Sequence, residues 1–560
     1  MKRQISLILF FLGLIKVVCG TGIQHSTLDT LNERVILFTD RNMYIAGEKI
    51  LFSAMVSGDY RDEIMSRILY CEIITPAGNK ITGGKYLILN SGSSGALTIP
   101  QDVISGNYYF RSYTRFMRNE GPAVYSYILI KIVNPIRNEI HINSTGISIS
   151  DSILYPFNGI NDTNSLSITT DRLLYKSRDT IQISIGSTSQ SSYQALNVAV
   201  VPELSSYNNG ISLHVKESTD VKSLYAPERA GISITGTVRD EINGNVLSGI
   251  RVNLSIIGEG RDFMATRTDS EGRFSFLLPE YEGYRDLFLC TDRSDSLNTG
   301  ILVDNDFCSI PVQLHAQNFE LSPEERETVL KMAVNYQLEL SFDIDSATDE
   351  TKDEEPEYQS FYGKPDEVIS MDNYVRLPTL EEYLNELPTL VKVRKRSGEK
   401  YFKILGPQTD LIEFDPLVMV DLVAIDDPEG ILAVNPANIS RIEVVNAIYA
   451  KGDQTYGGIV NFISRKRDFA GINLPSSGIF INYGFLTPGT SALKYSKLPN
   501  IPDPRNTIFW EPHLVLDMKN AITFKFAAPD TPGNYLIILK GINSAGIPVR
   551  QTHNLEIVKR

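Results

Sequence analysis

The chain has 560 residues, 42% of them hydrophobic, and a formal net charge of −14, so it can bury the cores of several domains. Half of the charge imbalance lies in the acidic run 343–357, which leaves the rest of the chain only mildly acidic. Nucleic-acid binding is excluded as a function, because phosphate binding needs a stripe or groove of Lys and Arg.

Residues 1–20 are predicted to form a cleaved signal peptide. Lys2 and Arg3 supply its positive start, residues 5–15 form an apolar core, and small residues near Cys19 offer a cleavage site. The apolar core is shorter than the ~20 residues that a membrane-spanning helix needs. We therefore expect an exported mature chain without a membrane-spanning segment. Lipidation at Cys19 and an uncleaved anchor stay open as alternatives.

An internal repeat comes next, in which a Thr-Asp-Arg tripeptide leads through a Tyr and an Ile into an alternating apolar strand. Its copies are Thr39-Asp40-Arg41 with Tyr44 and Ile50, and Thr170-Asp171-Arg172 with Tyr175 and Ile181. The constant spacing predicts two related β-sandwiches, at 30–135 and 136–228.

The first copy contains TDRNMYIAGEKILFSA and then SGNYYFRSYT, and it resembles the second macroglobulin domain of the α-macroglobulin family. The second copy looks like a weaker relative. Family members that trap proteases carry a Cys-x-Glu-Gln thioester, and none of the four cysteines here stands in that pattern. Covalent protease trapping is therefore excluded.

Residues 229–316 are predicted to form a third β-sandwich. Their GTVRDEINGNVLSGIRVNL and TDSEGRFSF stretches resemble the carboxypeptidase-regulatory-like domain, a module often found before plug domains in receptors of Bacteroidota. Cys290 and Cys308 are close enough in sequence to bridge neighbouring strands in an oxidising compartment. Either a disulfide between them or two buried thiols is expected, and Cys71 is expected to be a small core residue.

Residues 317–356 are predicted to comprise a helix and an acidic linker. The helix covers 321–340, with Ser322 as N-cap, Pro323 in the first turn and Glu325 completing a capping box. The acidic run is expected to be a solvated linker. A calcium site is the alternative, although the run lacks the Gly of the usual calcium loop.

Residues 357–475 are predicted to form a small α/β domain, with Asp421 after one buried strand and Tyr456-Gly457-Gly458 before another. The stretch 416–465 resembles the plug domain of TonB-dependent outer-membrane receptors, in which IDG, IxxIEV and YGxxAxGGVIxI motifs recur in this order. The resemblance implies a stopper for a β-barrel of roughly 22 strands. Only 96 residues follow Ser464, so we expect the domain to dock onto something else and not to form a pore.

Two basic runs lie in the same domain. Arg394-Lys395-Arg396 belongs to a predicted hairpin of strands 390–395 and 401–404, and Arg465-Lys466-Arg467 ends a predicted strand. Solvated strand ends are expected, with a patch for lipid headgroups or an acidic partner as the alternative.

Residues 476–560 are predicted to be a C-terminal β segment. FWEP and FKFAAPDTPGNYLIILKGINSAG look like part of a macroglobulin domain. The segment is short for a whole sandwich, so we expect it to complete a sheet begun elsewhere in the chain. Trp510 is expected to anchor a core.

We interpret the chain as a multidomain, mainly β protein: β-sandwich (macroglobulin/Ig-like) modules plus a small α/β plug-like domain. No catalytic, cofactor-binding or metal-binding residue is predicted, since no nucleophile elbow, P-loop, dinucleotide motif or His pair is present. We expect a non-enzymatic envelope protein of the periplasm or outer membrane that docks onto another envelope protein, such as a β-barrel. A surface glycan- or nutrient-binding accessory protein is the alternative, with Tyr281, Tyr284 and Phe288 as candidate ligand aromatics.

Overall fold

The computed structural model describes most of the chain, and the following statements refer to that part. The described residues are 32–58, 65–141, 160–161, 166–187, 193–206, 225–257, 262–292, 298–314, 318–342, 360–387, 389–406, 411, 413–452, 454–489, 493, 501–516, 521–543 and 548–560. They are mainly β, and none of their helices is both long and apolar enough to cross a membrane. The signal peptide, Cys19 and the acidic run lie outside the described residues.

The chain divides into two compact units, which are described separately. Unit 1 comprises Met1–Arg229, Cys308–Ala347 and Gly489–Arg560, and unit 2 comprises Ala230–Phe307 and Thr348–Pro488. Each unit is therefore assembled from segments that are distant in sequence.

The first sandwich of unit 1 is a continuous piece of chain. Its strands are β1 (Glu33–Thr39), β2 (Met43–Ile45), β3 (Lys49–Gly58), β4 (Ile68–Ile74), β5 (Lys80–Leu87), β6 (Gly92–Thr98), β7 (Gly106–Thr114) and β8 (Ser126–Val133). One sheet has the order β1-β3-β6, and the larger sheet has the order β2-β8-β7-β4-β5. Only β2 and β8 pair in parallel. Tyr and Phe fill the core, as expected for strands rich in aromatic residues.

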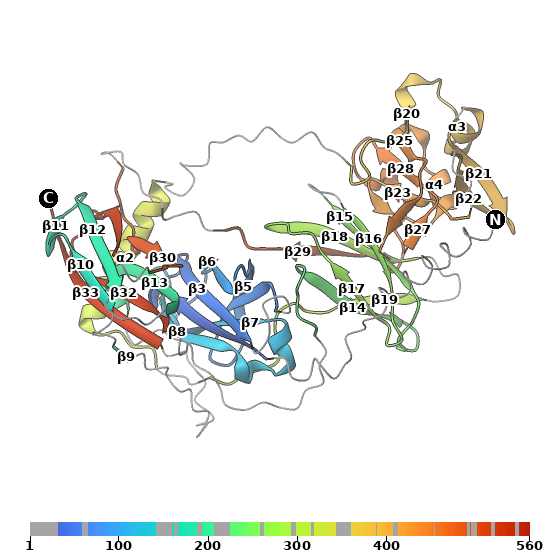
Figure 1. Cartoon of the computed structure of the whole chain (residues 1–560). Helices are drawn as coiled ribbons and strands as arrows, with labels where there is room; N and C mark the ends of the chain where they lie inside the picture. The colour runs from blue at the N-terminus through green and yellow to red at the C-terminus, as the bar shows by residue number, and fades with distance from the viewer. Residues whose placement is uncertain are drawn as a thin grey trace, which may run out of the picture. The chain divides into compact units, whose positions relative to one another are not determined.

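The second sandwich of unit 1 repeats the first strand for strand but is split in sequence. Its strands are β10 (Leu166–Thr170), β11 (Leu174–Lys176), β12 (Thr180–Ser187), β13 (Tyr193–Pro202), β30 (Phe509–Glu511), β31 (Ile522–Ala527), β32 (Gly533–Asn543) and β33 (Pro548–Val558), with β9 (Ile160–Asn161) added beside β33. The sheet orders are β10-β12-β31 and β11-β33-β32-β13-β30. In Figure 1 the red C-terminal strands lie among the teal strands of this sandwich.

These pairings confirm that the C-terminal segment completes a sheet begun elsewhere, because β32 pairs with β13 over most of its length. They also correct the predicted boundaries. Residues 136–228 supply only half of the second sandwich, and the other half comes from the segment predicted as 476–560. The chain between β13 and β30 is an insertion at the place where the first sandwich has only the short turn between β4 and β5.

Helix α2 (Pro323–Ser341) covers one end of the first sandwich. The capping box of Ser322 and Glu325 is formed as predicted, and Pro323 takes the first turn. The helix buries Val329, Met332, Ala333 and Tyr336 against Met43 and Ile45 of β2. Tyr336 lies so close to Gly47 that a Cβ at that position would be 2.1 Å from its hydroxyl oxygen. Gly47 also has a φ of 98°, so glycine is required there on both counts.

Unit 2 contains the third sandwich, for which the sequence predicted 229–316. Its strands are β14 (Ser233–Asp240), β15 (Arg251–Ile257), β16 (Phe263–Arg267), β17 (Arg273–Leu277), β18 (Tyr284–Thr291) and β19 (Thr299–Val303). The sheet orders are β17-β14-β19 and β16-β15-β18-β29, where β29 (Ile479–Gly484) comes from after the α/β domain. The boundary predicted at 475 is therefore also corrected, because the next strand belongs to this sandwich.

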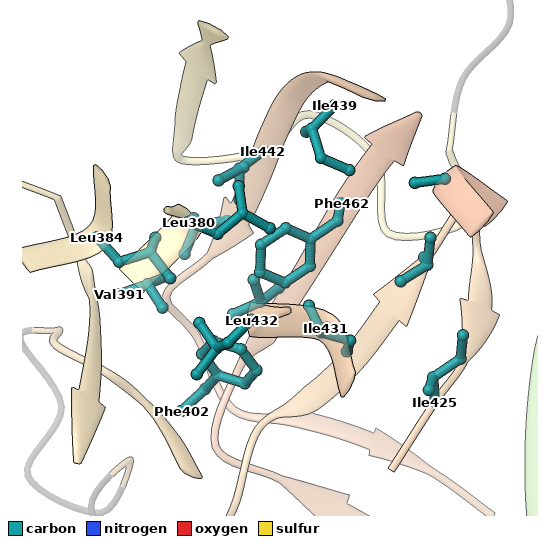
Figure 2. Packing of buried hydrophobic residues seen from close by; sticks show 14 of the residues in the cluster. Leu380, Leu384, Val391, Phe402, Ile425, Ile431, Leu432, Ile439, Ile442 and Phe462 are labelled. Atoms are coloured by element: carbon teal, nitrogen blue, oxygen red, sulfur yellow. The ribbon is translucent and has the colours of Figure 1, made fainter. Parts of the chain in front are cut away.

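The α/β domain is built on a mixed sheet of order β20-β25-β28-β23-β24. Its elements are β20 (Glu367–Ser370), α3 (Leu380–Glu386), β21 (Val391–Arg396), β22 (Glu399–Ile404), β23 (Leu417–Val420), β24 (Val423–Ala424), α4 (Pro428–Leu432), β25 (Ile439–Val445), β26 (Tyr449–Lys451), β27 (Gln454–Tyr456) and β28 (Ile459–Ser464). Figure 2 shows its core, in which leucines of α3 and α4 meet Phe402 of β22 and Phe462 of β28.

Candidate interaction sites

Two segments that flank the third sandwich in sequence are fixed to the first sandwich, and we call them the stem segments. They are residues 225–229, before the third sandwich, and residues 308–314, after it. Both belong to unit 1. They lie on the larger sheet of the first sandwich, on strands β4 and β7.

The second stem segment is held by a buried ion pair. Glu72 and Arg111 are register partners on β4 and β7, both are fully buried, and Arg111 Nε lies 2.6 Å from Glu72 Oε2. Arg111 also donates a hydrogen bond to the Cys308 carbonyl (2.9 Å). The Cys308 N–H donates to the Tyr113 hydroxyl (2.8 Å), which in turn donates to Glu72. Burial and the Glu72 carboxylate raise the pKa of Tyr113 well above its usual value.

The first stem segment is held by a second buried carboxylate. Glu228 accepts hydrogen bonds from the Tyr70 hydroxyl (2.8 Å) and from Arg115 (3.4 Å). The guanidinium of Arg118 lies 4.3 Å from the centre of the Tyr225 ring. Because Tyr70 and Tyr113 are cross-strand partners with stacked rings, the two stem segments are anchored on adjacent positions of one sheet.

Sequence reasoning missed this anchoring, although a signal was present. Glu72 and Arg111 each stand in a strand of otherwise uncharged, mostly apolar residues. Charged residues are almost never fully buried unless they are paired. One acid and one base in two neighbouring apolar strands therefore indicate a buried pair, but the register that makes them neighbours comes from the sheet.

The first copy of the repeated motif is a buried polar junction. Tyr44 donates to Asp40 (2.7 Å), and Arg41 pairs with Glu48 (2.9 Å). The next sandwich contributes Thr507, which donates to Asp40 (2.5 Å), and Asn506, which donates to Glu48 (2.7 Å). The side chains of the motif are therefore closed off by a partner segment.

The second copy keeps the internal bonds and has no such cover among the described residues. Tyr175 donates to Asp171 (2.5 Å), and Arg172 lies 3.4 Å from Asp179. The Arg172 side chain is 57% exposed, against 3% for Arg41. The same residue pattern thus forms a junction in one sandwich and an open surface in the other.

Asp421, which the sequence placed in the plug-like motif, has a structural role. Asp421 and Leu422 both have positive φ and form the turn that reverses β23 into β24. The carboxylate accepts hydrogen bonds from Ser464 N (2.8 Å), Ser464 Oγ (2.6 Å) and Phe469 N (2.9 Å). These bonds offset the cost of a left-handed conformation without glycine.

The Tyr456-Gly457-Gly458 signature marks a close passage of two backbones. A Cβ on Gly457 would lie 2.3 Å from the Phe414 carbonyl oxygen, and one on Gly458 would lie 2.5 Å from that of Val445. Gly458 also has a φ of 94°. Larger residues are therefore excluded where the chain enters β28.

The basic runs end up on the surface of the α/β domain. Strands β21 and β22 form the predicted hairpin through Ser397 and Gly398, and Arg394, Lys395 and Arg396 are exposed at its end. Arg465, after β28, makes a two-bonded ion pair with Asp372 (2.6 and 3.0 Å). The hairpin end therefore offers the more open positive surface.

The three candidate aromatics of the third sandwich do not form one platform. Phe288 is buried in the core, and Tyr281 donates to Asp262 (2.7 Å) while the guanidinium of Arg285 lies 4.5 Å from the centre of its ring. Only Tyr284 is open to solvent, with 73% exposure.

The structure decides between the two outcomes that the sequence left open for Cys290 and Cys308. Cys290 and Cys308 are free, buried thiols, Cys290 in unit 2 and Cys308 in unit 1. The Cys290 thiol donates to the Ala424 carbonyl (3.7 Å), and burial raises its pKa to about 12. Cys71 is a buried thiol as expected, next to Ser112.

Described side chains form no group that could hold a metal ion. The described histidines, His141, His513 and His553, belong to different contacts: His141 packs near Tyr108, His513 near Gly92, and His553 beside Thr170. Beside α2 lies a pocket of about 280 Å³. Asn335, which lines this pocket, is already bonded to Asn506 and Thr531, two other lining residues.

Together these features define a multidomain β protein with three sandwiches and one α/β domain. No protein-family model matches the chain, and a search of curated proteins finds no match either. Among solved structures it is similar to Escherichia coli alpha-2-macroglobulin activated by porcine elastase (8% identity, 94% of this chain, 44% of that chain, TM-score 0.22). It is also similar to Salmonella alpha-2-macroglobulin reacted with methylamine (8%, 94%, 39%, 0.23) and to dimeric latent PorU from Porphyromonas gingivalis (10%, 50%, 34%, 0.15). The chain thus spans less than half of these proteins, and its fold assignment rests on the strand orders above.

Proposed function

We propose that this chain is a non-enzymatic exported protein that works by docking onto another protein of the envelope, in the periplasm or at the outer membrane. In this proposal the macroglobulin-like sandwiches and the carboxypeptidase-regulatory-like sandwich act as a scaffold, and the plug-like α/β domain makes the contact. An outer-membrane β-barrel is the partner that the plug-like sequence favours.

One observation carries the proposal. The α/β domain closes its hydrophobic core together with Phe288 and Cys290 of the third sandwich, and it exposes three consecutive basic residues at the end of the β21–β22 hairpin. Exposed charges contribute little to stability even where they pair, as Arg396 does with Asp415 (3.8 Å), so these residues can attract an acidic partner surface and set its orientation. The residues of the plug-like motif, Asp421 and Gly457 among them, serve to hold this domain together.

The test is recovery of a partner from envelope extract of a Gram-negative bacterium. We expect the wild-type chain to recover a discrete envelope protein and the variant Arg394→Glu/Lys395→Glu/Arg396→Glu to lose it. A control with the same change of charge at exposed sites elsewhere is Arg239→Glu/Lys364→Glu/Lys525→Glu. Equal recovery by both variants, or none by the wild type, would contradict the proposal.

The alternative is a glycan-binding accessory role. It is favoured by Tyr284, whose exposed ring lies over Gly484, so that a Cβ there would approach within 3.1 Å of it. Flat exposed aromatic rings are suitable platforms for ligands that stack. A glycan array would detect binding that Tyr284→Ala abolishes and that Tyr374→Ala, also exposed, preserves.

A further inference from the structure

A row of polar side chains crosses the outer face of the larger sheet in the second sandwich. Asn197 on β13 is the register partner of Lys540 on β32, and Lys540 is the register partner of Arg550 on β33. The same face of β32 carries Ile542, which packs against Phe38 of the first sandwich. Side chains two residues apart lie on one face of a strand, so the row lies at the junction of the two sandwiches. We call Asn197, Lys540 and Arg550 the polar row.

Two members of the polar row are buried and keep bonding groups that no described residue meets. Asn197 and Lys540 are each 1% exposed. Neither polar atom of the Asn197 amide has a hydrogen-bond partner among the described residues. The Lys540 ammonium can donate three hydrogen bonds, and the one that it makes in the described part of the chain goes to the Thr39 carbonyl (3.0 Å). A buried polar group without a partner is costly, and it commonly marks the place of a water molecule or an ion.

The charge of the polar row favours an anion over a water molecule. Arg550 brings a second positive charge beside Lys540, and burial together with Arg550 lowers the pKa of the Lys540 ammonium to about 8. The described carboxylate that acts on Lys540 belongs to Asp40, and both of its oxygens already accept hydrogen bonds, from Tyr44 (2.7 Å) and Thr507 (2.5 Å). Lys540 is therefore a buried cation that pairs with no described carboxylate, whereas buried charges are rarely found without a partner.

From this arrangement we propose that the polar row binds a small inorganic anion such as chloride, held by the Lys540 ammonium and the Asn197 amide N–H. The anion neutralises the buried cation and accepts hydrogen bonds that these donors otherwise lack. Arg550, at the β33 end of the row, is partly exposed and gives the ion a positively charged entry. Because Lys540 also bonds to Thr39 of the first sandwich, a bound anion stabilises the junction between the two sandwiches.

Thermal unfolding of the full chain in sodium chloride, compared with sodium gluconate at equal concentration, tests the proposal. Gluconate is too large for a buried site, so we expect chloride alone to raise the Tm, with a saturating rise of about 2–5 °C. Lys540→Met removes the cation and should abolish this rise. Any gain in Tm of Lys540→Met over the wild type should therefore be smaller in saturating chloride than in gluconate. The control Arg239→Met, at an exposed site, should keep the full rise.

A second variant makes the test independent of the packing of Lys540. Asn197→Asp places a carboxylate of nearly the same size beside Lys540, where it supplies the negative charge itself. We expect this variant to have a higher Tm than the wild type in gluconate and to show no response to chloride. A wild type whose Tm is the same in both salts would overturn the proposal. So would a chloride rise that Lys540→Met and Asn197→Asp both retain in full.

Anomalous X-ray scattering locates the ion itself. Crystals of the full chain soaked in sodium bromide, which takes the place of chloride, should show a bromide peak beside Lys540 Nζ and Asn197 Nδ2. The same soak of Asn197→Asp crystals should show no peak there. A water molecule at this position in the wild type, without an anomalous signal, would contradict anion binding.

Discussion

The two repeated sandwiches of unit 1 share one strand frame and differ in what lies on the outer face of the larger sheet. At one register pair the first sandwich carries Glu72 and Arg111, and the second carries Ala199 and Ile538. The ion pair binds the main chain of a stem segment, whereas the apolar pair packs against Trp510. Trp510 thus anchors a core as expected. The comparison teaches that both sandwiches keep the same strand order and register, whereas the outer face of the larger sheet is polar in one and apolar in the other.

The largest loss of stability is expected when the buried ion pair of the first sandwich is broken. Glu72→Ala leaves the Arg111 charge buried without its partner, and we expect a loss of about 3–5 kcal/mol in the free energy of unfolding. The double variant Glu72→Ala/Arg111→Ile imports the pair of the second sandwich and should cost clearly less than Glu72→Ala alone. Urea unfolding of the whole chain, followed by near-ultraviolet circular dichroism of its tyrosines, measures both. A double variant less stable than the single one would contradict this account.

The next prediction compares the loss of stability when the arginine is removed from each copy of the Thr-Asp-Arg motif. Arg41→Ala removes one partner of a buried pair and leaves Glu48 uncompensated, so we expect a loss of about 3 kcal/mol. Arg172→Ala removes an exposed partner and should cost less than about 1 kcal/mol. The same urea measurement compares the two, and equal losses would show that the burial difference has no energetic meaning.

A smaller change in stability is expected at Lys540, which lies at the junction between the first and second sandwiches. Lys540 is buried on β32 and donates to the Thr39 carbonyl (3.0 Å). Burial, with Arg550 adding, lowers its pKa to about 8 from an ordinary value of 10.5. Below pH 8 both the folded and the unfolded chain carry this charge, so the folded state bears the full cost of burying it. That cost declines as the pH rises from 8 toward 10.5, where the folded state has lost the proton and the unfolded state still holds it.

Lys540→Met should therefore stabilise the chain by on the order of 1–3 kcal/mol at neutral pH. Its advantage should shrink between pH 8 and pH 10, which unfolding curves at several pH values would show. Arg239→Met, at an exposed site, serves as the control and should show no such trend. An advantage that stays constant with pH would mean that the Lys540 proton is not involved.

Local chemistry made several elements predictable. The capping box of Ser322 and Glu325, the hairpin turn at Ser397-Gly398 and the crossing at Gly457-Gly458 depend on residues close together in the chain. The pairing of the two halves of the second sandwich could not be predicted in this way, because more than 300 residues separate β13 from β30. The sequence left open whether Cys290 and Cys308 form a disulfide or are two buried thiols. They are buried thiols, because the two residues are close in sequence but each is packed into a different unit.

By itself the sequence determined the mainly β character of the chain, the repeated motif and the local turns, since each arises from neighbouring residues and their conformational preferences. The tertiary structure alone decided which motif copy is buried, that Glu72 meets Arg111, and which residues of α2 are buried against β2. These outcomes depend on which distant segments pack together. An identical Asp-Arg-Tyr pattern is a closed junction where Thr507 reaches it and an exposed surface where no described segment does.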